Sequence, residues 1–305
     1  MNKSGHGAVL SRVGTAPPAP AALVLVLHGG SADSFTMTRG RDLAVLRLWP
    51  IARVIARVVP SVAVHRLRFS VRGWNADGAA VVRDARWAIQ ILRERFPSVP
   101  IVLVGHSMGA RTALHVGGDA DIAGLVLLAP WAPSDDPAEQ LAGRTVVVVQ
   151  GARDRMVPEP TTRPWLARAR AAGARVSSTL LPFGGHTMLR RFWVWHRLAA
   201  QGVLTVITES AAAPAGWAGW SADGVGTAVR VGTPDGVGEA GRMGTAGRVG
   251  TARRVGTAGR VGTARRMGTA GRMGTAGRVG TADGVGTADG VGRPFRPDRR
   301  PDRAS

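Results

Sequence analysis

Four short, continuous apolar runs constrain the fold more than any other feature of this chain. Each run is rich in Val, Ile and Leu and is bounded by Gly, Pro or charged residues. Continuous rather than alternating apolarity at this length is typical of strands buried on both faces of a parallel sheet. The runs are Ala22–Leu27, Ile101–Val104, Ile122–Leu128 and Thr145–Val149, with Val62–Phe69 and Val176–Leu181 as weaker candidates.

Amphipathic stretches of helical period separate these runs. They cover Arg41–Val58, Ala79–Phe96, Thr161–Ala172 and Arg190–Gln201. Pro50 predicts that the first of them consists of two helical pieces, because proline is favoured at the first position of a helix. Strands that alternate with helices of this length predict an α/β fold, with a mostly parallel, doubly wound sheet covered by helices on both faces.

The composition changes near residue 209 and divides the chain. We expect an N-terminal extension over residues 1–20, one α/β domain over 21–208 and a low-complexity tail over 209–305. In the tail, glycines recur at every sixth position from Gly226 to Gly292, in units such as VGTAGR. With one Val or Met per unit the tail cannot bury enough apolar surface to offset chain entropy, so we expect it to be disordered.

The formal charge of the 305 residues is +20, from 40 Lys and Arg and 20 Asp and Glu. We expect non-specific attraction to anions by the arginine-rich tail, but no specific nucleic-acid binding, because the aromatic interleaving of single-strand binders is missing. Cysteine is absent, which excludes disulfides, a thiolate metal site and a cysteine nucleophile. No stretch has the pattern of a signal peptide or a membrane span, so a cytoplasmic protein is expected. We also expect no metal and no cofactor.

The segment Gly105-His106-Ser107-Met108-Gly109 carries the strongest chemical signal. It directly follows the buried run Ile101–Val104 and precedes a helix-like stretch, Ala110–Val116. In this setting the pattern Gly-x-Ser-x-Gly predicts a nucleophile elbow, a tight strand-to-helix turn that holds the serine hydroxyl above the sheet. A structural Gly-Ser turn is the alternative.

A serine hydroxyl needs a base within hydrogen-bond reach to act as a nucleophile. His186 follows the run Val176–Leu181, and Asp154 follows Thr145–Val149. Both would therefore lie at carboxyl ends of strands, where doubly wound sheets place their sites. We predict His186 as the base and Asp154 as the carboxylate that orients it. Asp135 and Asp136, after the run Ile122–Leu128, are the rival candidates for the acid.

An oxyanion hole completes such a site. The loop Leu27-His28-Gly29-Gly30-Ser31 follows the first apolar run, and we predict that the backbone N–H groups of Gly30 and Met108 stabilise the developing oxyanion. A simple tight turn is the alternative for this loop. His28 is expected at the pocket, fixing the loop rather than taking part in catalysis.

Four motifs together resemble the α/β-hydrolase superfamily, over about residues 21–202. They are HGG after the first strand, GHSMG between a strand and a helix, GARDRMVP after a strand, and GGH after the last strand. The segments HGGSADS, VRGWN and APW are more narrowly similar to uncharacterised actinobacterial α/β hydrolases, which bring no known substrate. The resemblance implies an α/β-hydrolase fold. The leading hairpin looks missing or vestigial, because only about 20 residues precede the first strong strand. Ala129–Arg144 is too short for a helical cap, so we expect an open pocket shaped by loops that carry Phe35, Trp74, Trp131 and Phe183. A place in the core is the alternative for each of these aromatic residues.

The sequence therefore predicts a serine hydrolase that acts on small acyl substrates, most plainly carboxyl esters, through an acyl-enzyme. A thioesterase, an amidase or an acyltransferase would use the same residues, and a binding protein with an idle triad is the alternative from another class. The oligomeric state is left open.

Overall fold

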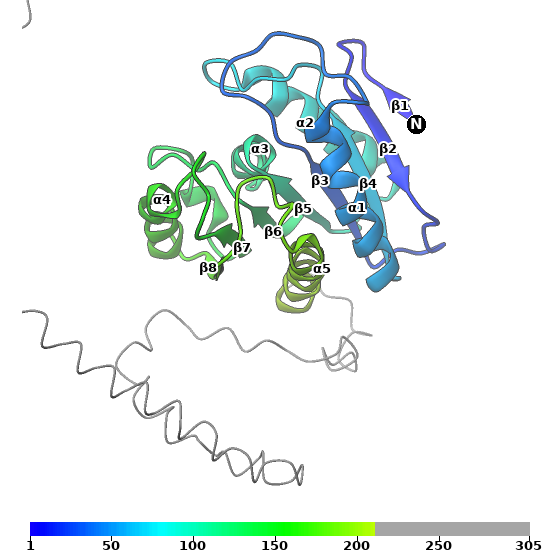
Figure 1. The fold of residues 1–305 in the computed structure, drawn as a ribbon. Helices are drawn as coiled ribbons and strands as arrows, with labels where there is room; N and C mark the ends of the chain where they lie inside the picture. The colour runs from blue at the N-terminus through cyan, green and yellow to red at the C-terminus, as the bar shows by residue number, and fades with distance from the viewer. Residues whose placement is uncertain (211–305) are drawn as a thin grey trace, which may run out of the picture. The chain divides into compact units, whose positions relative to one another are not determined.

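The computed structural model describes residues 1–210, and the predicted tail, apart from its first two residues, lies outside the described residues. Within this part the chain forms one sheet in the order β1-β2-β4-β3-β5-β6-β7-β8. Strands β3 to β8 run parallel, whereas β1 and β2 are antiparallel to their neighbours (Figure 1). The strands are β1 (Asn2–Lys3), β2 (Val9–Val13), β3 (Ala22–Leu27), β4 (Val62–Arg68), β5 (Ile101–His106), β6 (Ile122–Leu128), β7 (Thr145–Gly151) and β8 (Arg175–Leu181).

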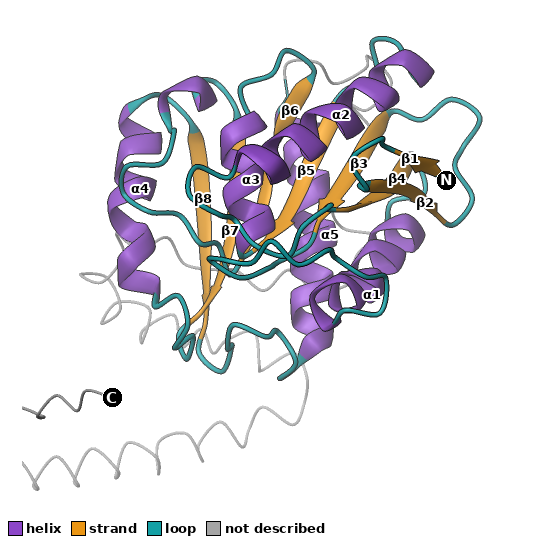
Figure 2. Ribbon diagram, turned by 90° about the horizontal axis from the view of Figure 1, so that it is seen from above, coloured by secondary structure: helices purple, strands orange, loops and turns teal. Residues whose placement is uncertain are grey.

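Helices cover both faces of this sheet (Figures 1 and 2). They are α1 (Leu43–Val58), α2 (Ala79–Arg95), α3 (Met108–Val116), α4 (Glu159–Ala171), α5 (Phe192–Glu209) and the short 3-10 helix η1 (Glu139–Leu141). Side chains of β3 alternate between two hydrophobic clusters. Leu23, Leu25 and Leu27 pack with α2, α3 and α4, whereas Val24 and Val26 pack with α1 and α5. The predicted doubly wound fold is confirmed.

No cap interrupts the sheet in the described part of the chain. The connection between β6 and β7 contains only the three-residue helix η1, which confirms that Ala129–Arg144 is too short for a lid. The carboxyl ends of β5, β7 and β8 are therefore left uncovered by any inserted domain. Within residues 1–210 no helix is both long and apolar enough to cross a membrane.

Two sequence expectations need correction. The leading hairpin, expected to be missing or vestigial, is present in a short form within residues 1–20: β1 has two residues and β2 has five, and β2 pairs with β4 from Val9↔Arg68 to Val13↔Val64. β1 is exposed at the sheet edge, and β2 is short and interrupted by Ser11 and Arg12, so both lack the continuous apolar signal of the central strands. The second correction concerns Pro50, which lies inside the single helix α1 and does not divide it.

Candidate active site

Ser107 lies at the turn between β5 and α3. Its backbone has φ 52° and ψ −117°, and α3 begins at the next residue. A positive φ is rare for residues other than glycine and stores strain. A Cβ atom at Gly105 would clash with the backbone of Gly109 and Ala110, and one at Gly109 would clash with the Leu27 carbonyl group of β3. The two glycines are therefore required for the tight turn predicted from the sequence.

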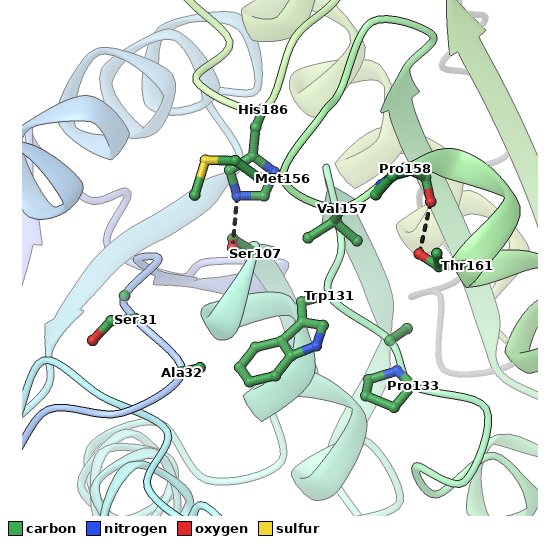
Figure 3. A pocket seen from close by; sticks show the side chains of 12 residues that line it. Ser31, Ala32, Ser107, Trp131, Pro133, Met156, Val157, Pro158, Thr161 and His186 are labelled. Atoms are coloured by element: carbon green, nitrogen blue, oxygen red, sulfur yellow. Dashed lines mark hydrogen bonds between the residues drawn. The ribbon is translucent and has the colours of Figure 1, made fainter. Parts of the chain in front are cut away.

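Three polar side chains meet where β5, β7 and β8 end. The Ser107 Oγ lies 2.8 Å from the His186 Nε2 (Figure 3). The His186 Nδ1 lies 2.8 Å from the Asp154 Oδ2. A carboxylate can only accept, so Nδ1 carries the proton and Nε2 accepts from the serine hydroxyl. All three residues are buried, with 5 to 7% of their surface exposed. The arrangement polarises the Ser107 hydroxyl.

Backbone groups hold the Asp154 carboxylate in place. Its Oδ1 accepts hydrogen bonds from the N–H groups of Met156 and Val157, at 3.0 and 2.8 Å. The loop that carries His186 is tied to this loop, because the Arg153 N–H donates to the Gly184 carbonyl oxygen at 2.9 Å. These contacts leave Oδ2 free to face the imidazole.

The rival acids are placed elsewhere. The Asp136 carboxylate is buried against the Arg111 guanidinium, with a shortest distance of 2.8 Å, and lies 3.5 Å from the His115 Nε2. Asp135 is exposed. Of the three candidates, Asp154 is the one that hydrogen-bonds His186.

The structure also brings the two predicted oxyanion donors together. A Cβ atom at Gly30 would clash with the Met108 side chain, so the loop after β3 lies directly against the start of α3. Among the described residues, neither the Gly30 nor the Met108 backbone N–H donates a hydrogen bond. Two backbone donors beside Ser107 are therefore available to a ligand. Met108 is also the first residue of α3, where the helix dipole favours negative charge.

An open pocket of about 500 Å³ lies in front of Ser107 (Figure 3). Apart from Ser107 and His186 it is lined by small, apolar or neutral residues. They are Gly30, Ser31, Ala32, Trp131, Ala132, Pro133, Met156, Val157, Pro158 and Thr161. None of these side chains is charged, so the pocket suits an apolar or neutral group.

The pocket residues predicted from the sequence have different places. Phe183 lines a separate pocket and not the one in front of Ser107. Trp131 lines the pocket. Trp74 does not, because it is only 2% exposed and packs in the core beside Gly78 at the start of α2. Phe35 is 79% exposed and does not line the pocket either. Its loop is held to the segment after β4 by bridges that leave this ring facing outward.

His28 anchors the loop after β3 rather than lining the pocket in front of Ser107. Its Nδ1 donates to the Gly29 carbonyl oxygen at 2.6 Å, and its Nε2 accepts from the Phe69 N–H at 3.1 Å. Both ring nitrogens are thus used to connect the loop to the end of β4. Burial lowers the pKa of His28 to about 4, so this residue stays neutral at physiological pH.

Arg111 is a supporting residue that the sequence did not reveal. Its guanidinium carbon lies 4.3 Å from the ring centre of Trp74 and 4.4 Å from that of Trp131. The Asp136 carboxylate fixes the same guanidinium. Cation–π contacts of this kind orient aromatic rings. The core residue Trp74 and the pocket wall Trp131 are therefore held by one arginine, four residues after Ser107.

His106 is a second supporting residue. Its Nε2 lies 2.9 Å from the His186 carbonyl oxygen, and the two ring centres are 5.1 Å apart. Because a carbonyl can only accept, Nε2 of His106 carries the proton. Burial, with a further contribution from His186, lowers the pKa of His106 to about 3. The residue before Ser107 thus fixes the loop of His186 while remaining uncharged.

The buried histidine of β4, His65, gives a test of how acid affects the stability of the fold. Burial lowers the pKa of His65 in β4 to about 4. Below pH 6.5 the unfolded chain takes up a proton at this residue and the folded chain does not until about pH 4, so stability falls as the pH drops through this range. Between pH 7.5 and pH 5, we expect the free energy of unfolding of the native chain to fall by about 2 kcal/mol more than that of His65→Phe. Urea unfolding at both pH values measures this difference, and equal losses would contradict it.

Among the described residues, no three His, Cys, Asp or Glu side chains come together in a way that could hold a metal ion. The residues that could bind a ligand near Ser107 are therefore the pocket wall and the two free backbone N–H groups. This arrangement is equipped to polarise a hydroxyl and to stabilise an oxyanion.

Comparison with known proteins adds a family model and similar solved structures. The model described as "Serine aminopeptidase, S33" matches residues 69–174, a range that includes Ser107 and Asp154. No protein with a curated description matches the sequence.

The similar solved structures cover about two thirds of this chain and most of their own. An α/β serine hydrolase homologue from Coxiella burnetii has a TM-score of 0.50 at 16% identity, covering 64% of this chain and 90% of its own. A protein from Xanthomonas campestris, described as an α/β serine hydrolase without a lid, has a TM-score of 0.50 at 20% identity, covering 65% and 88%. An α/β-hydrolase enzyme from a Medee basin deep-sea metagenome library has a TM-score of 0.52 at 18% identity, covering 67% and 94%. At these identities the likeness is one of fold.

Proposed function

We propose that this chain, which has the fold of α/β hydrolases and matches a serine aminopeptidase S33 model over residues 69–174, is a serine hydrolase of that superfamily. In this proposal the protein hydrolyses carboxyl esters of small acyl groups through an acylated Ser107. The observation that carries this proposal is the hydrogen-bonded series from Ser107 through His186 to Asp154, at the base of an open pocket. In this proposal Ser107 is the nucleophile, His186 the base and Asp154 the group that orients the base.

Acylation would begin with attack of the Ser107 Oγ on the ester carbonyl carbon. His186 Nε2 takes the serine proton, and the Asp154 carboxylate stabilises the imidazolium that forms. The N–H groups of Gly30 and Met108 donate to the carbonyl oxygen as it becomes negative. His186 then returns the proton to the leaving alcohol, whose bond to the carbonyl carbon breaks, and the acyl group remains on Ser107.

Deacylation would use the same groups in the same order. A water molecule gives its proton to His186 Nε2 and attacks the acyl carbon. The proton then passes to Ser107 Oγ as the carboxylic acid leaves. No cap covers the pocket in the described residues, so water reaches the acyl-enzyme freely. This access favours hydrolysis over transfer to another acceptor.

The pocket supports small, uncharged acyl groups. Its volume is about 500 Å³, and Trp131, Met156 and Val157 give it an apolar wall. A charged acyl group would lose its hydration there without a compensating partner. Acetyl to hexanoyl esters of a neutral chromogenic alcohol are therefore the first substrates to test.

The test is to measure labelling by a fluorophosphonate probe together with hydrolysis of this ester series. We expect covalent labelling, and hydrolysis that falls for esters of succinate, whose second carboxylate would enter the apolar pocket. Parallel assays of acyl thioesters and anilides separate an esterase from a thioesterase or an amidase. A well-folded protein that neither takes the probe nor turns over any acyl substrate would contradict the proposal and favour a binding protein.

A further inference from the structure

Helices α1 and α5 lie side by side on one face of the sheet (Figures 1 and 2). Their N-terminal ends and the loop before α5 carry a group of exposed apolar side chains. We name this surface the α1–α5 face. Its members are Leu43, Leu46, Trp49, Leu189, Phe192 and Trp193, which expose between 45 and 75% of their surface. An exposed apolar cluster of this kind indicates an interaction surface.

The cluster is continuous. Leu43, Leu46, Leu189 and Phe192 line one apolar groove of about 380 Å³. The Trp193 ring contacts the Phe192 ring, with 5.3 Å between the ring centres. Trp49 follows Leu46 by three residues on α1 and is therefore its neighbour on the helix surface. The face thus joins both helices and the loop that precedes α5.

Arginines adjoin the α1 side of this face. Arg47 lines the groove, and Asp42 is the single acid in residues 39–57. The Asp42 carboxylate is already paired with Arg72, at 2.7 Å. The Arg53 guanidinium rests on the Trp49 ring, at 4.5 Å from its centre. The face is therefore apolar, with cationic side chains along α1.

We infer that the α1–α5 face docks on the surface of an anionic lipid bilayer, with its leucine and aromatic side chains inserted among the acyl chains. Trp is enriched at the membrane interface, and arginines beside it attract anionic headgroups. Peripheral binding of this kind needs no membrane-spanning helix. The inference goes beyond the proposed function, because it concerns where the protein binds rather than what it cleaves.

A second copy of this chain fits the face less well. In a two-fold dimer the same surface meets itself, so the arginines of one copy would face those of the other without acids to neutralise them. Like charges opposed in an interface are unfavourable. An anionic bilayer supplies negative headgroups for the arginines and an apolar interior for the exposed leucine and aromatic side chains.

The experiment is co-sedimentation of the full chain with vesicles of phosphatidylcholine alone or with phosphatidylglycerol. Because the whole chain carries a charge of +20, variants that keep every charge are needed to separate insertion from simple attraction. Leu46→Gln is matched by Leu180→Gln on β8, since both leucines are 48% exposed. The double variant Leu46→Gln/Leu189→Gln strengthens the test.

We expect binding to the anionic vesicles, a partition coefficient about tenfold lower in the double variant, and no change for Leu180→Gln. Circular dichroism checks that each variant is folded. Absence of binding, or binding unaffected by the double change, would overturn the inference. A monomer–dimer equilibrium that Leu46→Gln abolishes would overturn it too, and would identify a second copy as the partner. Vesicle binding is measured without substrate, so its failure is distinct from failure of the proposed function.

Discussion

Ser107→Ala is expected to fold like the native chain and to lose ester turnover by about 10⁴-fold or more, together with all labelling by a fluorophosphonate probe. The alanine keeps the Cβ atom and therefore the same backbone constraint at φ 52°. It removes only the hydroxyl whose Oγ lies 2.8 Å from the His186 Nε2. His186→Ala should fall to a similar level, because the members of a triad act as one unit.

The matched control is Ser177→Ala, which removes an exposed serine hydroxyl on β8 and should leave turnover and labelling unchanged. Probe labelling followed by mass determination and a thermal melt of each variant supplies the measurement. Labelling that persists in Ser107→Ala would place the nucleophile at another residue. A loss of labelling with an unchanged melt is the expected pair of results.

Asp154→Asn is expected to reduce turnover by about 10⁴-fold through the wrong histidine tautomer. The Asp154 Oδ1 accepts from the backbone N–H groups of Met156 and Val157, so the amide oxygen of an asparagine would occupy that position. Its NH₂ group would then be directed at His186 Nδ1 and could only donate. His186 would have to carry its proton on Nε2, where it could no longer accept from Ser107.

Asp136→Asn is the control for this prediction. Asp136 pairs with Arg111 and not with His186, so its loss should lower the melting temperature with a far smaller effect on turnover per folded molecule. Steady-state kinetics on the soluble fraction, corrected by active-site labelling, separates the two effects. A larger loss of turnover for Asp136→Asn or Asp135→Asn than for Asp154→Asn would show that the acid has been misassigned.

The central strands were predictable because each is buried on both faces. A strand such as β3, Ala22–Leu27, is apolar at every position, and an uninterrupted apolar run of that length is typical of a strand inside a parallel sheet. β1 and β2 were missed because they are short, with two and five residues, and because Ser11 and Arg12 interrupt the apolar positions of β2. Continuous apolarity detects the middle of a sheet better than its edges, and β8 at the opposite edge was only a weaker candidate.

The candidate triad could be predicted because its residues follow strands directly, so the strand assignment also positions the side chains. The pocket wall could not. Trp74 and Trp131 lie close to one another at Arg111, yet only Trp131 reaches the pocket. Whether a tryptophan is buried in the core or lines the pocket depends on how the helices pack around it. The local sequence does not reveal that packing.

The supporting residues were hidden for a related reason. His106 is adjacent to Ser107 in sequence, but its contact is with the carbonyl oxygen of His186, which is 80 residues away. Met156, Val157 and Thr161 enter the pocket from the loop after β7 and the start of α4. The motif that contains Asp154 was recognised for its carboxylate, while its neighbours gave no separate signal.

The backbone conformation of Ser107 creates a trade-off between the proposed catalysis and thermal stability. A non-glycine residue in such a conformation costs about 1–3 kcal/mol, and glycine would adopt φ 52° without that cost. Ser107→Gly would therefore yield a more stable protein that lacks the proposed nucleophile. A screen of random variants for heat resistance alone would enrich inactive molecules at this residue. Engineering of this chain for stability consequently requires simultaneous selection for turnover.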